Sequence, residues 1–169
     1  MNRLAWILVP ALCLACVACG PYWYRHPELF TVASSHLNYV QIYCQASENA
    51  PRQRCDLRDN GQVIFREGRS VSVGDDFNIE YKDRHFTDDR TTYFNMDLTL
   101  FNASLQALVD AGLFMEEEKP EDDTPVYPKI LVKANINHHV IDKFTFHEPL
   151  VAEIRAQLFQ YRMAGRRIE

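Results

Sequence analysis

Positive charge and glycine are both scarce in this sequence of 169 residues. Lysine and arginine number 18 against 23 aspartates and glutamates, which gives a formal net charge of −5 at pH 7. Because nucleic-acid binders usually carry a basic stripe, this charge argues against a nucleic-acid partner. Only six glycines are present, and neither the GxGxxG pattern nor the Walker A pattern of nucleotide-binding proteins occurs. We therefore expect no nucleotide, and we expect no other cofactor.

The motifs of common hydrolases are absent as well. There is no GxSxG nucleophile elbow and no HExxH zinc motif. Aspartate pairs occur at 75–76, 88–89 and 122–123, but they lie in polar stretches, where neighbouring carboxylates are usually solvated. The acidic stretch 116–124 lacks the spacing of an EF-hand loop, so it predicts a polar connection and leaves calcium as a minor alternative. We therefore expect a protein that is not an enzyme and has no catalytic residue.

Three histidines near acidic residues form the only cluster with the composition of a metal site. His138, His139 and His147 lie close in sequence to Asp142 and Glu148. Adjacent side chains of a strand point to opposite faces, so His138 and His139 would not easily bind the same ion. We therefore expect no metal ligand here, and an enzyme that uses these histidines is the least favoured hypothesis.

The longest apolar run is short for a membrane span. Residues 4–18 carry no charge and follow the single positive charge of Arg3. A stretch of about 15 residues falls below the roughly 20 that a helix needs to cross a bilayer. A charged start followed by a short apolar core is typical of a secretory signal peptide, which we expect at residues 1–18. A plain secretory signal without lipid and an uncleaved anchor remain alternatives.

The end of this stretch, residues 14–20 (LACVACG), resembles the lipobox of bacterial lipoproteins. In that family a small residue precedes the cysteine that receives lipid and becomes the mature N-terminus, as Ala18 precedes Cys19. Cys16 is a second candidate. In the enterobacterial sorting rule, aspartate after the cysteine retains the protein at the inner membrane, and here Gly20 follows. The resemblance therefore implies acyl chains on Cys19 and attachment to the outer membrane, facing the periplasm.

If the signal is removed and Cys19 carries lipid, two cysteines remain, Cys44 and Cys55, as an even pair in an oxidising compartment. The segment between them is polar and carries Pro51, as a loop would. A disulfide would close a loop of about 12 residues and contribute on the order of 3 kcal/mol. Two free thiols or a metal pair are the alternatives, although this spacing is not a zinc signature. We expect the disulfide.

Domain organisation follows from these segments. Residues 20–35 mix aromatic side chains with Pro21 and Pro27 and show no hydrophobic period. We therefore expect a lipidated N-terminus and linker over residues 19–35, followed by a single domain over residues 36–169, a size that suits one core.

Within this domain, alternation of apolar and polar residues predicts a sheet. The expected strands cover residues 37–43, 62–65, 69–73, 77–81, 127–141 and 150–163. A turn at Asn60 and Gly61 precedes the second of them. Residues 97–111 form the expected main helix, because their apolar residues recur at spacings of three and four. Gly112 then occupies the position of a left-handed C-cap, and Asn95 or Asp97 could cap the start. The predicted class is α+β, a mainly antiparallel sheet covered by this one helix.

The order of elements from residue 97 onward carries a resemblance. A helix, the sequence Ala111-Gly112-Leu113-Phe114, a loop, the strand KILVKANI and a second strand ending before two arginines follow one another. This order resembles the half-domain of periplasmic lipoproteins of the curli-secretion channel and the amino-terminal domain of the Tol translocation protein. The resemblance implies a part in a secretion or assembly machine and leaves a homo-oligomer open. It transfers no functional residue to this chain.

Together these features predict a non-enzymatic outer-membrane lipoprotein that acts as an assembly or export accessory of a cell-envelope machine. Its expected partners are the membrane, through the lipid anchor, and protein components of that machine. The alternative is a lipid-tethered binding module for a small ligand, a polysaccharide or a peptide. An apolar pocket with convergent polar groups would favour the binding module.

Overall fold

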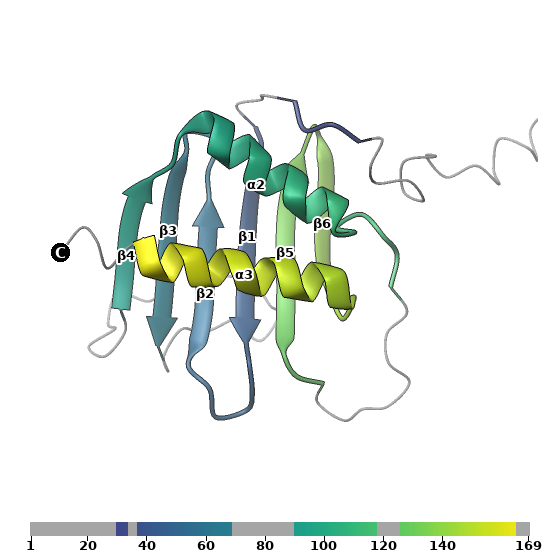
Figure 1. The fold of residues 1–169 in the computed structure, drawn as a ribbon. Coiled ribbons are helices and arrows are strands. Elements are labelled where there is room, and N and C mark those ends of the chain that lie inside the picture. The colour runs from purple at the N-terminus through teal and green to yellow at the C-terminus, as the bar shows by residue number, and fades with distance from the viewer. Residues whose placement is uncertain (1–29, 34–36, 69–89, 118–125, 165–169) are drawn as a thin grey trace, which may run out of the picture.

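The computed structural model of the chain describes residues 30–33, 37–68, 90–117 and 126–164. In these ranges six strands form one antiparallel sheet in the order β4-β3-β2-β1-β5-β6, and two helices cover one of its faces (Figure 1). The elements are β1 (Tyr39–Gln45), β2 (Arg52–Leu57), β3 (Gln62–Gly68), β4 (Arg90–Asn95), α2 (Leu98–Asp110), β5 (Lys129–Ile136), β6 (His139–Phe144) and α3 (Glu148–Ala164). The predicted α+β class and the packing of the main helix on an antiparallel sheet are confirmed.

The core lies between the sheet and the two helices. Alternate residues of the strands point toward the helices and are buried, as the period of two in a strand requires. From the sheet these are Val40, Ile42, Cys44, Cys55, Leu57, Val63, Phe65, Ile130, Val132, Ala134 and Ile136, and from the helices mainly Phe101, Leu105, Leu108, Leu150, Ile154 and Leu158. Burial of each large apolar side chain contributes about 1.5–3 kcal/mol, so this two-layer core is the main source of stability.

The helix predicted at residues 97–111 is α2. Asp97 caps its start, because the Asp97 carboxylate accepts a 2.6 Å hydrogen bond from the backbone N–H of Thr99. Gly112 has φ +101°, the left-handed conformation expected of it, and a Cβ there would lie 2.9 Å from Cδ2 of His147. Leu98 differs from the expectation: it belongs to the apolar stripe in sequence but is 54% exposed.

The strand predicted at residues 150–163 is wrong, because this segment is α3. Leu150, Ile154, Leu158 and Tyr161 are buried at spacings of four, four and three, which places them on one face of a helix. Ala152 and Ala156 also fit the alternation of a strand, but both are exposed in α3. Two helices therefore cover the sheet where one was expected.

The single strand predicted at residues 127–141 is also wrong, because the chain reverses at Asn137 and His138. These two residues have φ values of +50° and +69°, so they form a two-residue turn between β5 and β6. Side-chain bonds of Asn137 support the turn: its Oδ1 accepts from the backbone N–H of Ala33 at 2.9 Å, and its Nδ2 donates to the carbonyl of Thr31 at 2.8 Å.

Other strand predictions had mixed outcomes. The strands predicted at 37–43 and 62–65 correspond to β1 and β3, and Gly61 before β3 has φ +78°. Two strands were missed: β2 begins in the segment taken for a loop between the cysteines, and β4 lies shortly before α2, where no strand was expected. The strands predicted at 69–73 and 77–81 lie outside the described residues.

The predicted signal peptide, Cys16 and Cys19 also lie outside the described residues. In the part of the chain that the structure does describe, no helix has both the length and the apolar character that crossing a membrane requires.

Candidate functional site

Strand β6 forms one edge of the sheet and exposes backbone groups there. In a hairpin with a two-residue turn, Ile136 and His139 form a hydrogen-bonded pair, and such pairs recur at every second residue. The Thr145 N–H donates to the Ile130 carbonyl at 3.0 Å, so Thr145 belongs to the same alternating set of residues as His139, the set whose backbone groups bond to β5. The backbone N–H and C=O groups of Val140 and Asp142 therefore point away from β5, toward the edge where no other described strand pairs.

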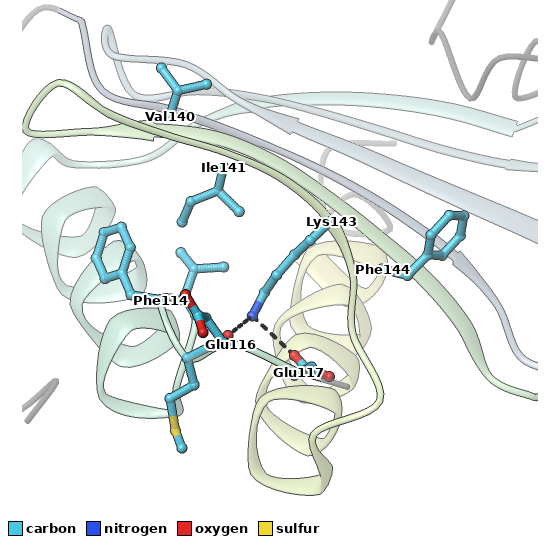
Figure 2. Close-up of a pocket in the computed structure, with 9 residues that line it drawn as sticks. Phe114, Glu116, Glu117, Val140, Ile141, Lys143 and Phe144 are labelled. Atoms are coloured by element: carbon cyan, nitrogen blue, oxygen red, sulfur yellow. Dashed lines mark hydrogen bonds and ion pairs between the residues drawn. The ribbon is translucent and has the colours of Figure 1, made fainter. Parts of the chain in front are cut away.

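A hollow of about 440 Å³ lies beside this edge. One wall is the segment 113–117 after α2, and the other is formed by Val140, Ile141, Lys143 and Phe144 of β6. Figure 2 shows Ile141 and Lys143 pointing from the strand toward Phe114 and Glu117, whereas Val140 points away from them. The hollow thus combines an apolar lining with a small group of charged side chains at one end.

Glu117 organises the charged end of the hollow. Its Oε1 accepts hydrogen bonds from Oγ1 of Thr145 at 2.6 Å and from Nζ of Lys143 at 3.0 Å. Its Oε2 accepts from the backbone N–H groups of Phe146 at 2.5 Å and His147 at 2.8 Å. These two N–H groups directly precede α3, so the carboxylate lies at the positive end of that helix and supplies a cap from a distant segment.

The surroundings of Glu117 favour its ionised form. Partial burial raises the pKa of Glu117, but the hydrogen bonds from Thr145, Phe146 and Lys143, together with the Lys143 charge, lower it by more. The net pKa lies below the usual glutamate value of 4.5. Glu117 is therefore a carboxylate at neutral pH, held by four donors.

Lys143 links the two walls of the hollow. Its Nζ donates to the carbonyl of Met115 at 2.6 Å and to Glu117 at 3.0 Å. An ammonium group has three donors, so one N–H is left beyond these two bonds. Lys143 and Glu117 balance each other in charge, and Glu116 adds a further carboxylate to the wall of the hollow.

The structure separates the three histidines that the sequence places close together. His138 occupies the β5–β6 turn, and the ring of His139 packs against Phe30 and Phe114 at centroid distances of 5.6 and 6.0 Å. His147 lies beside Gly112 and donates its backbone N–H to Glu117. Over the described ranges, no group of three or more His, Cys, Asp or Glu side chains is placed to hold a metal ion.

The predicted disulfide is not formed in the structure: Cys44 and Cys55 are both free and buried. The register pairs Cys55 with Ile42 and Cys44 with Gln53, so the two cysteines are diagonal neighbours on adjacent strands. Diagonal residues lie about 7–8 Å apart, whereas a disulfide needs Cβ atoms about 3.5–4.5 Å apart. Residues 46–51 form the turn between β1 and β2, and the register of these two strands, which the loop-closure argument did not consider, keeps the cysteines apart.

A second charged pair lies on the face of the sheet opposite the helices. Arg54 and Asp56 of β2 are 3% and 2% exposed, and Arg54 Nε lies 3.0 Å from Asp56 Oδ1. Residues i and i+2 of a strand share a face, which explains why the two side chains meet. Their burial marks them as structural groups.

Sequence reasoning did not identify Glu117 or Lys143. Residues 116–124 were interpreted as a polar connection, and nothing in the local sequence shows that Glu117 meets residues 143–147 in space. A helical reading of residues 148–164 would have suggested that the N–H groups before residue 148 need an acceptor.

This chain matches no protein-family model, no curated protein and no solved structure.

Proposed function

We propose that this chain is a lipid-anchored accessory of a cell-envelope machine, and that it binds an extended segment of a partner protein along β6. The anchor is Cys19, the location is the periplasmic side of the outer membrane, and the role is binding without catalysis. The observation that supports binding is the combination of edge backbone groups on β6, which no described strand pairs, with the hollow beside it. The sequence LACVACG supports the anchor.

The edge of β6 suits the addition of a strand. Such addition gains affinity from main-chain hydrogen bonds and specificity from pockets that take alternate side chains. Val140 and Asp142 offer the main-chain groups, and the hollow lies on the side to which Ile141 and Lys143 point. A partner strand would therefore place every second side chain toward the hollow, where an apolar side chain contacts Phe114 and Ile141.

A small molecule is the second candidate for the same hollow. Its volume of about 440 Å³ falls within the range of about 300–1,000 Å³ that is usual for ligand pockets. Its lining combines apolar side chains with polar groups, and Lys143 retains one donor there. This second candidate, a lipid-tethered binding module for a small ligand, depends only on the hollow and does not require the backbone groups at the edge of β6.

Matched proline variants at the two edges of the sheet test the proposal. Val140→Pro removes an outward N–H of β6 and leaves the β5 bonds in place, and proline is tolerated on edge strands. On the opposite edge, the Met96 N–H to Gly61 carbonyl bond of 2.8 Å fixes the parity of β4, so Tyr93→Pro removes an outward N–H there. A photo-crosslinker that replaces Asp142, introduced into wild type and both variants in intact envelopes, shows whether a partner protein occupies the edge of β6.

We expect the crosslinker to capture one envelope protein in wild type and in Tyr93→Pro, and to lose it in Val140→Pro. Equal capture in all three would contradict strand addition along β6, because the captured protein would then bind without the outward N–H of Val140. No captured envelope protein in wild type would argue against the accessory role. Acyl labelling of Cys19→Ser tests the anchor separately: label should disappear, and persistent label would place the lipid on Cys16.

A further inference from the structure

The solvent-facing side of α3 is apolar at a regular spacing. Ala152, Ala156, Phe159 and Met163 are all exposed, and they follow one another at intervals of four, three and four. Phe159 is 63% exposed and Met163 is 42% exposed. This spacing is that of a helix face that packs against another helix, but within the described ranges no helix lies on it.

The neighbouring α2 extends this apolar surface. The two helices run antiparallel: Gln157 Nε2 donates to the Ser104 carbonyl at 3.0 Å, and His147 before α3 lies beside Gly112 after α2 (Figure 1). The start of α2, with Leu100 at 61% exposure, therefore lies level with the end of α3. We call Leu100, Ala152, Ala156, Phe159 and Met163 the helix-layer surface.

Charge is sparse on this surface. Over its 13 residues α2 contains no lysine or arginine and only one acidic residue, Asp110. On α3, Arg162 is engaged with Glu67 at 3.1 Å, and Glu153 accepts a bond from Gln157 at 2.8 Å. The exposed Glu148 and Arg155 are the other two charged residues of α3, and they flank the apolar side chains. Low charge together with exposed aromatic and methionine side chains is the composition of the centre of a protein interface.

We propose that the helix-layer surface binds a second copy of this chain, with α3 packed antiparallel against α3 of the second copy around a two-fold axis. An interface of this symmetry must be self-complementary. With the axis midway between residues 157 and 158, Ala156 faces Phe159 of the second copy and Ala152 faces Met163 of the second copy. Each large side chain then meets a small one, as close packing between facing positions requires.

The charges agree with the same axis. Arg155 lies level with the neutral Gln160 of the second copy, and Glu153 lies level with Arg162 of the second copy. No two arginines and no two glutamates of α3 come level in residues 152–163. A parallel pairing in register would instead set Phe159 against Phe159 and Arg155 against Arg155, which leaves the alanines facing each other across a gap.

The available area predicts a weak, concentration-dependent dimer. A helix of 17 residues is about 25 Å long, and two helices packed about 10 Å apart form a layer about 20 Å wide. Each copy would therefore bury about 500 Å², or about 1,000 Å² in total, at the lower limit for a specific interface. A common membrane anchor, which rests on the proposed function, would raise the local concentration; the dimer itself does not depend on it.

Sedimentation velocity of the purified full chain in mild detergent, over a range of concentrations, tests the proposal. We expect a monomer–dimer equilibrium in wild type and a dissociation constant raised by about tenfold or more in each of Phe159→Ala and Ala156→Phe. The decisive variant combines both changes, because it exchanges the large and small partners across the axis. Its dimer should be tighter than that of either single variant.

The outcomes separate the alternatives. A wild type that stays monomeric at all concentrations would overturn the proposal, as would a double variant as weak as the two losses added together. Val140→Ala, which alters an exposed residue of β6 remote from α3, should leave the dimer unchanged. If dimerisation fails but the β6 crosslink persists, the proposed function stands without the dimer; if the dimer forms and the crosslink is absent, only the proposed function fails.

Discussion

The Glu117 carboxylate accepts a 2.8 Å hydrogen bond from the backbone N–H of His147, thirty positions further along the chain. His147 directly precedes α3, so a single side chain from the end of the α2 connection fixes the start of the second helix. Thr145, Phe146 and Lys143 donate to the same carboxylate. The position of α3 on the sheet therefore depends on Glu117 as well as on its buried face.

Replacing Glu117 should destabilise the protein. Glu117→Gln keeps one acceptor oxygen but loses the charge and half of the acceptor capacity, so we expect the free energy of unfolding to fall by about 1–3 kcal/mol. Urea denaturation measures this value. Glu116→Gln is the matched control: Glu116 is exposed, and its replacement should cost less than about 0.5 kcal/mol.

The pH dependence of the same variant gives a second readout. Because the folded state holds the pKa of Glu117 below 4.5, its contribution is present above that pH and is lost as the pH falls through the folded pKa. Wild type should therefore lose stability on acidification more steeply than Glu117→Gln. Parallel curves for the two proteins would contradict the role assigned to this carboxylate.

The ion pair on the opposite face predicts a larger effect. Asp56→Asn removes a negative charge 3.0 Å from the buried guanidinium of Arg54, and breaking a buried pair in this way costs about 3–5 kcal/mol. Asp142→Asn is the control, because Asp142 pairs with Lys133 at 3.1 Å while its side chain is 58% exposed. Such a pair contributes at most about 1 kcal/mol.

Thermal unfolding of both variants by calorimetry compares these two losses directly. Equal shifts of the unfolding temperature would show that Arg54 and Asp56 are not a buried pair in solution. A shift at least three times larger for Asp56→Asn would agree with the difference in burial between the two sites.

Local signals in the sequence were enough to predict some of the elements. Asp97, the apolar spacing after it and Gly112 define α2, because cap, period and left-handed terminus agree. β1 was likewise predictable, since its alternation is strict. In α3 the local signals conflict: Leu150, Ile154 and Leu158 fit both a strand with period two and a helix face with period four. The buried Tyr161 breaks the tie, since it is odd-numbered and fits only the helix.

The site was harder to predict than the fold because its contacts are distant in sequence. Glu117 and His147 belong to segments separated by two strands, so no local spacing indicates that they meet. The turn between β5 and β6 was also hard to predict from the sequence, because Asn137 and His138 form it without the glycine that usually marks such a turn. The bonds of Asn137 to residues 31–33, and the bond from its backbone N–H to Oδ1 of Asn38, support the reversal there.

The two thiols of the domain should be present but slow to react. Burial raises the pKa of Cys44 from 9.0 to about 11 and that of Cys55 well above 9.0. A rise of about two units lowers the thiolate fraction of Cys44 about 100-fold, and the thiolate is the reactive form. We expect the alkylation of both cysteines in the native protein to be at least that much slower than in urea.

Mass spectrometry of separate Cys44 and Cys55 peptides, after alkylation with one reagent before and another after unfolding, measures this for each residue. Both cysteines should carry the second reagent. A Cys44–Cys55 disulfide in the oxidised protein would require a different register of β1 on β2 from the one that pairs Ile42 with Cys55.

Alkaline pH should destabilise the domain through these same buried groups. Burial raises the pKa of Cys44, Cys55 and Tyr161, so each contributes stability that is full below its unfolded pKa and is lost as the pH rises through the folded pKa. The free energy of unfolding should therefore change little up to about pH 9 and then fall, by up to about 1.4 kcal/mol per pH unit for each group. In Cys44→Ala, the slope between pH 9 and 11 should decrease by about the contribution of one proton, whereas Val140→Ala, which removes no titratable group, should leave the slope unchanged. Urea denaturation across this pH range measures both variants, and an unchanged slope in Cys44→Ala would show that Cys44 is not protonated and buried in the native protein.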